Sequence, residues 1–183
     1  TRGSLAGTRA AVPAMERALN ACGPDATSLR ARLLATLSMQ LWGGRDISLD
    51  RDHRIELAEE ARSIARQIED PRALTLSLRA LFTAMEGPEW LDQRIPVASE
   101  LLAAAETSGD RSEILWARVW RIGAIALRGD TDAVKAEIVI ASGLADEMRE
   151  PAYSGWRPMW EGRLALRDGR FDDAERRIGE AAP

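Results

Sequence analysis

The chain has few of the side chains that most often carry out chemistry. Its 183 residues include one cysteine, one histidine and one tyrosine, and aromatic residues make up only 5%. A single cysteine excludes an intrachain disulfide, so nothing in the sequence implies export to an oxidising compartment. A metal site at His53 would need two or three further ligands at fixed spacing. We therefore expect an exposed His53, no catalytic residues, no metal and no cofactor.

The sequence also has no long apolar run and no excess of basic residues. No stretch approaches the roughly 20 apolar residues of a membrane span, and the first residues show no signal-peptide pattern. The net charge is −4, whereas a domain that reads nucleic acid by itself usually carries a basic stripe. We expect a piece of a longer cytoplasmic protein with no membrane or direct nucleic-acid contact.

Signals for β-strands are equally scarce. Hydrophobic residues make up 45% of the chain and are mostly alanine and leucine, which favour helices. Glycine, proline and capping residues divide the chain into nine helical segments joined by short turns. The predicted segments are 5–21, 29–41, 50–68, 70–86, 90–107, 110–128, 130–147, 150–168 and 172–182. The third is expected to begin at an Asp50 cap, and the eighth at Glu150-Pro151.

A 40-residue period runs through the second half of the chain. Trp116 and Trp120 stand one helical turn apart, and the same pair returns as Trp156 and Trp160. The same offset relates Gly129 to Gly169 and relates Asp70, Asp110 and Glu150 to one another. Such periods are typical of repeat arrays, in which each unit buries its apolar face on its neighbours. We predict an all-α protein, a right-handed superhelix of antiparallel hairpins over residues 25–68, 70–108, 110–148 and 150–183, forming one domain over 1–183.

The stretch from Trp160 to Glu175 resembles a tetratricopeptide repeat. In that repeat, small residues let the helices approach closely, and an aromatic residue fills the space at the turn between them. The matching residues here are Gly162, Gly169, Phe171, Ala174 and Ala181. Leu127-Arg128-Gly129-Asp130 is a second, weaker match. The period is nearer 40 than 34, and the other segments lack most of the consensus.

This longer, degenerate repeat resembles the helical-repeat region of large actinobacterial ATP-dependent transcriptional regulators, of the MalT-like and large LuxR type, and of related cyclase-linked ATPases. In that family the repeats sense an inducer or a partner protein, while ATPase and output domains lie elsewhere in the chain. The present sequence contains no P-loop and no evident helix-turn-helix. The resemblance implies a non-catalytic sensor or protein-interaction module in transcription regulation and signal transduction.

Four residues are the candidates for ligand or partner binding in the concave groove formed by the first helix of each hairpin: Trp116, Trp156, Met159 and Arg163. Aromatic and arginine side chains often anchor partners. Trp116 and Trp156 could equally belong to the core between hairpins, where we expect Trp120 and Trp160 to lie. Three alternatives stay open: a structural spacer without a ligand, a helical-scaffold enzyme, and self-association through exposed repeat ends.

Overall fold

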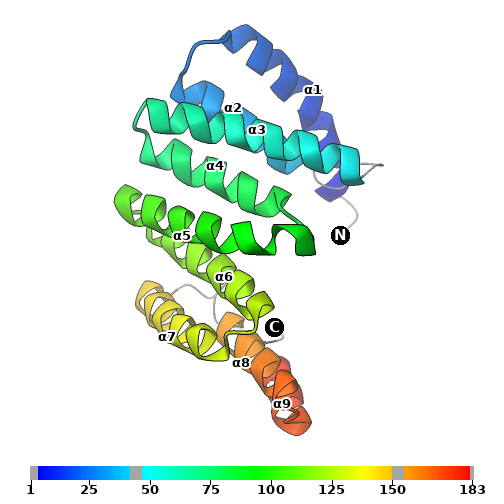
Figure 1. The fold of residues 1–183 in the computed structure, drawn as a ribbon, viewed down its shortest axis with the longest axis vertical. Coiled ribbons are helices and arrows are strands. Elements are labelled where there is room, and N and C mark those ends of the chain that lie inside the picture. Colours follow the sequence, from blue (N-terminus) through cyan, green and yellow to red (C-terminus); the bar gives the residue numbers. More distant parts are fainter. Residues whose placement is uncertain (1–3, 42–46, 150–154, 182–183) are drawn as a thin grey trace. The chain divides into compact units, whose positions relative to one another are not determined.

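The computed structural model describes residues 4–41, 47–149 and 155–181, and every regular element within those ranges is helical. The all-α prediction is confirmed. The nine α-helices of the described ranges and one short 3₁₀ turn are labelled in Figure 1. They are α1 (Ser4–Cys22), α2 (Ser28–Gln40), α3 (Ile47–Gln67), α4 (Pro71–Ala84), η1 (Pro88–Trp90), α5 (Leu91–Ser108), α6 (Arg111–Arg128), α7 (Thr131–Met148), α8 (Trp156–Arg167) and α9 (Phe171–Ala181).

The chain divides into two compact units. The first unit is Thr1–Ala117 and the second is Arg118–Pro183, so the division falls within α6. The core of each unit is built mainly from alanine and from leucine, isoleucine or valine. Small alanine side chains let helix axes approach closely, and the larger aliphatic side chains fill the space between them.

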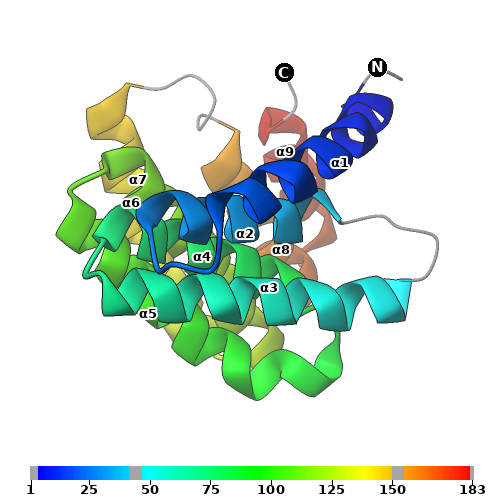
Figure 2. The same cartoon turned by 90° about the horizontal axis from the view of Figure 1, so that it is seen from above.

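In the first unit, successive helices stack as hairpins. Helix α3 packs on α2, and α4 packs on both of them before α5 packs on α4. Figure 1 shows α3, α4 and α5 lying alongside one another in this order, and they overlap in the view from above in Figure 2. Leu34, Leu78, Leu81 and Leu101 fill the interfaces and are at most 1% exposed. Helices α2 and α4 are thus the first helices of two consecutive hairpins, as the repeat pattern predicts.

Capping bonds confirm the predicted helix starts at Asp70, Asp110 and Asp130. Asp70 accepts hydrogen bonds from the backbone N–H groups of Arg72 and Ala73, and Asp130 accepts one from Ala133. These bonds satisfy N–H groups that have no partner within the helix. The prediction for Asp50 is wrong, because α3 begins at Ile47 and Asp50 lies inside the helix.

Other boundaries differ by a few residues. The predicted start at Glu150-Pro151 lies outside the described residues, and α8 begins at Trp156 with Gly155 as its N-cap residue. Helix α4 ends at Ala84, two residues before the predicted end at residue 86, and Pro88 opens the 3₁₀ turn η1 that leads into α5.

A buried arginine connects three helices of the first unit. Arg54 on α3 is 3% exposed, and its Nε donates to the carbonyl oxygen of Ser38 on α2 at 3.0 Å. Its terminal nitrogen donates to the carbonyl oxygen of Thr83 on α4 at 2.9 Å. The Ser38 hydroxyl donates in return to the Arg54 carbonyl at 2.8 Å. Buried charged groups are tolerated when they are hydrogen-bonded in this way.

The second unit confirms the predicted close approach of two helices at Gly162. A Cβ atom at Gly162 would lie 2.8 Å from Ile178 Cγ1, so only glycine allows α8 and α9 to approach this closely. Ala174, which faces the same contact, is 2% exposed. The expectation that Phe171 packs into the turn between the two helices is wrong, because its side chain is 67% exposed. Phe171 is the first residue of α9, and the smaller Ala174 one turn later takes the buried position.

Candidate binding site

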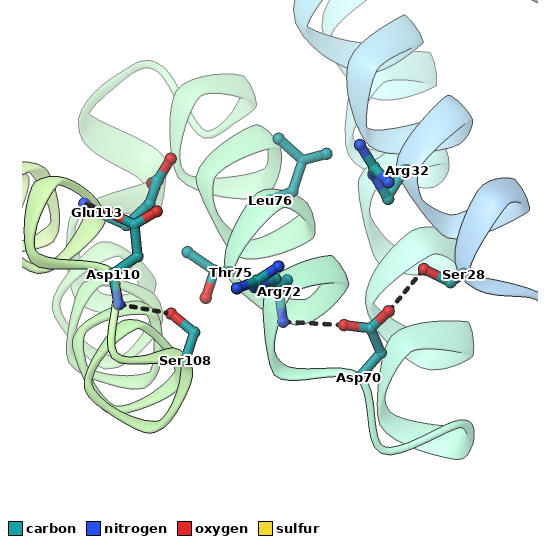
Figure 3. A pocket seen from close by; sticks show the side chains of 9 residues that line it. All are labelled: Ser28, Arg32, Asp70, Arg72, Thr75, Leu76, Ser108, Asp110 and Glu113. Atoms are coloured by element: carbon teal, nitrogen blue, oxygen red, sulfur yellow. Dashed lines mark hydrogen bonds between the residues drawn. The ribbon is translucent and has the colours of Figure 1, made fainter.

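A cavity of about 420 Å³ opens in the first unit, where the N-terminal ends of three helices meet. It is lined by Ser28 and Arg32 of α2, by Asp70, Arg72, Thr75 and Leu76 at the start of α4, and by Ser108, Asp110 and Glu113 at the turn from α5 into α6. Figure 3 shows these nine side chains around the cavity. Helices α2, α4 and α6 are the first helices of successive hairpins, and the cavity lies at their N-terminal ends. Its volume falls within the range of about 300–1,000 Å³ that is typical of small-molecule sites.

Two of the lining carboxylates cap the helices that form the cavity. Asp70 caps α4 through one oxygen, and its other oxygen accepts a hydrogen bond of 2.6 Å from the Ser28 hydroxyl of α2. The Ser28 hydroxyl holds the pKa of Asp70 below its ordinary value. The Ala73 N–H and the charge of Arg32 make smaller contributions in the same direction. Asp110 caps α6 in the same way, with its Oδ1 accepting from the N–H groups of Ser112 and Glu113.

The hydroxyl groups around the cavity are also occupied by the protein. Ser28 donates to Asp70, Thr75 donates to the Pro71 carbonyl at 2.8 Å, and Ser108 donates to the Ala105 carbonyl at 2.8 Å. Each hydroxyl has only one proton to donate. A bound molecule would therefore find few neutral donors here, and charged groups would dominate its recognition.

The charged groups that remain available lie on two sides. The guanidinium groups of Arg32 and Arg72 donate no hydrogen bond to any residue of the described ranges, and both side chains are exposed. Across Thr75 and Leu76 from them, Asp110 and Glu113 form the other side, as Figure 3 shows. Glu113 is paired through Oε1 with Arg79 at 2.8 Å, but its Oε2 and Asp110 Oδ2 accept no hydrogen bond from the described part of the chain.

Of the four residues proposed from the sequence, Trp116 is the one that belongs to the first unit. Its side chain is 41% exposed on α6. It stands one helical turn after the lining residue Glu113, and residues three apart share a helix face. The 40-residue offset also makes it the counterpart of Leu76, which lines the cavity from α4. Trp116 is thus an exposed aromatic residue on the lining face of α6.

The other three candidates lie on α8 in the second unit and form a different arrangement. Trp156 is 9% exposed and meets Trp160 edge to face, with 6.4 Å between ring centroids. Trp160, which we expected in the core, is 7% exposed. Arg163 is exposed and covers the Trp160 ring at 4.9 Å, while Met159 is half-buried. Trp156 is therefore a core residue of its unit, which excludes the alternative that its ring lies on an open groove surface.

The sequence alone does not mark the cavity residues as a site. It indicates Asp70 and Asp110 only as helix caps, and nothing distinguishes Arg32, Arg72 or Glu113 from the many other charged residues of exposed helix faces. The available signal was the repeated Asp at the start of two first helices, which brings equivalent helix ends to one edge of a stacked array.

The described ranges contain no candidate metal site. There, no group of three or more His, Cys, Asp and Glu side chains is arranged to hold a metal ion. His53 is exposed, as expected, with its Nδ1 3.7 Å from Glu56. No helix in the described part of the chain has both the length and the apolar character needed to cross a membrane.

Comparisons with known proteins do not assign the chain to a family. No family model matches it, and no match was found among curated proteins.

Proposed function

We propose that this chain is a non-catalytic binding module, which recognises a small-molecule inducer or a segment of a protein partner at the N-terminal ends of α2, α4 and α6. The observation that carries the proposal is the cavity of about 420 Å³ on the first helices of successive hairpins. Concave sites between stacked helices are common binding surfaces of repeat proteins. The resemblance noted in the sequence would place such a module within a larger cytoplasmic transcriptional regulator.

Chemical composition of the cavity supports binding over catalysis. General acid–base catalysis needs a group with a pKa near the working pH, and nucleophilic catalysis needs an activated nucleophile. The pKa of the Asp70 carboxyl is lowered by its hydrogen bonds, which keeps it ionised and in its capping role. The lining serine and threonine hydroxyls donate to carbonyl or carboxylate oxygens. No lining histidine is present to activate them.

A spacer without a ligand is the second candidate. The burial of Trp156 and Trp160 favours it for the second unit, where the tryptophan pair serves packing. The two candidates are compatible, because each applies to a different unit. The proposal for the first unit depends on the cavity alone.

A stability screen tests the proposal. The chain would be heated with a panel of metabolites and short peptides, because a ligand that binds only the folded state raises the melting temperature. We expect at least one compound to raise it in the natural chain but not in Leu76→Trp, which fills the cavity with the residue found at the equivalent position of α6. Stabilisation that is equal in both proteins, or absent throughout, contradicts the proposal.

A further inference from the structure

The charges around the cavity restrict which ligands it can accept. A purely anionic ligand held by Arg32 and Arg72 would face the carboxylates of Asp110 and Glu113, in addition to that of Asp70, whose charge Arg32 already stabilises. A purely cationic ligand would face the two guanidinium groups. Placing like charges together opposes binding, and this repulsion is a common source of specificity.

Helix N-termini do not change this balance. The first N–H groups of α4 and α6 attract anions in principle, but Asp70 and Asp110 already accept hydrogen bonds from them. The available anion-binding groups are therefore the guanidinium groups of Arg32 and Arg72. Guanidinium groups match a carboxylate in geometry as well as in charge.

The opposite side offers carboxylate oxygens to a cation. Asp110 Oδ2 accepts no bond within the described residues, since the capping bonds use Oδ1. Glu113 Oε2 is available in the same sense, since Arg79 bonds to Oε1. An ammonium group has three N–H donors, and these two carboxylate oxygens can accept hydrogen bonds from it.

From these two sides we infer that the cavity binds a small zwitterion with a free carboxylate and a free ammonium group, of the class of amino acids and short peptides. Arg32 and Arg72 hold the carboxylate, and Asp110 with Glu113 holds the ammonium group. Leu76 lies between them and contacts the apolar part of the ligand. This inference rests on the proposed binding role of the same cavity and specifies the ligand class.

Calorimetric titration of the whole chain with alanine, dialanine and trialanine tests the class directly. We expect one free-ended member to bind best, because its length matches the separation of the two charged sides. N-acetylation or C-amidation of that member should each weaken binding by about ten- to hundredfold, the typical effect of losing a hydrogen bond to a charged group. The inference is overturned if no free-ended member binds, or if blocked forms bind as tightly.

Protein variants then assign each end. Arg72→Gln should weaken binding of the free and N-acetylated forms and leave the C-amide unaffected. Asp110→Asn keeps the capping oxygen, so it should weaken binding of the free and C-amidated forms only. Coupling between a variant and the modification of one end identifies a direct contact. Exposed residues of α1 provide matched controls, Arg17→Gln and Glu16→Gln, which do not line the cavity.

The outcomes separate the inference from the proposed function. If blocked peptides bind as well as free ones and Leu76→Trp abolishes binding, the cavity is a binding site but not for zwitterions. If Leu76→Trp changes no titration, both statements are wrong. Coupling of Arg72→Gln to N-acetylation instead of amidation also overturns the inference. Should a variant fail to fold, the peptide series on the natural chain still decides.

Discussion

Trp116 and Trp156 occupy the same position of the 40-residue period, yet their surroundings differ. Trp116 is 41% exposed and Trp156 is 9% exposed. Helix α6 begins at Arg111, so Trp116 lies in its second turn. Helix α8 begins at Trp156, so the equivalent residue is its first. The residue type repeats, but the position within the helix does not.

The two units differ in structure in the same way. In the first unit, the aligned starts of α2, α4 and α6 surround a charged cavity. In the second unit, the tryptophan pair and Gly162 maintain close packing of α8 with its neighbours. Sequence periodicity thus identifies equivalent residues, whereas the packing around each helix decides which of them faces solvent.

The largest expected effect follows from truncating the two tryptophans. Trp156→Ala should lower the free energy of unfolding by about 3–5 kcal/mol, since it removes a buried aromatic side chain and leaves a cavity. Trp116→Ala should lower it by less than about 1 kcal/mol, because much of its ring is already in water. Guanidinium denaturation followed by circular dichroism measures both. Equal effects would remove the contrast between the units.

A second prediction concerns the buried arginine of the first unit. Arg54→Leu should destabilise the chain by about 2–3 kcal/mol, because the carbonyl oxygens of Ser38 and Thr83 lose a charged donor inside the protein. Arg17→Leu, at an exposed position of α1, is the control and should change stability by less than about 0.5 kcal/mol. The same denaturation experiment applies. A stable Arg54→Leu protein would show that packing alone holds α2, α3 and α4 together.

Alanine substitutions at two glycines of the second unit should change the stability in opposite directions. Gly162→Ala should destabilise by about 1–2 kcal/mol, because its new methyl group would lie 2.8 Å from Ile178 Cγ1. Gly143→Ala on α7 meets nothing within 4 Å and should stabilise by about 0.5–1 kcal/mol through helix propensity. Thermal unfolding distinguishes the signs. Two stabilised variants would mean that α8 and α9 do not need close approach.

The smallest effect depends on pH. The lowered pKa of Asp70 means that its ionised form stabilises the fold above pH about 4, and that this contribution is lost as the pH falls through the lowered value. Ser28→Ala should raise the pKa of Asp70 toward its ordinary range. It should also cost less than about 1 kcal/mol at neutral pH, and the difference should shrink in acid. An NMR titration of the Asp70 carboxyl measures the shift, and an unchanged pKa would mean that the hydroxyl is not its main cause.

Local signals account for the parts of the fold that were predicted. Asp70, Asp110 and Asp130 precede helices as predicted, because capping depends on a few neighbouring residues. Asp50 has the same chemistry but lies within α3, since the helix continues N-terminally to Ile47. Gly162 was predicted correctly because close helix approach tolerates no side chain.

The candidate site could not be predicted to the same extent. The cavity combines Arg32, Arg72 and Glu113, which are separated by about 40 residues along the chain and become neighbours only when hairpins stack. Their charges resemble those of any solvated helix face. Exposure of Trp116 and burial of Trp156 likewise depend on packing that no single segment specifies.

Tryptophan side-chain resonances test the central claim most directly, because each indole N–H gives its own signal in a ¹⁵N-labelled chain. Titration with the best-binding alanine peptide should shift the backbone amides of Thr75, Leu76 and Ser108 and the indole of Trp116. The indoles of Trp156 and Trp160 should stay in place. Shifts confined to Trp156 and Trp160, or no shift at any of these positions, would contradict a binding site on the first helices of the first unit.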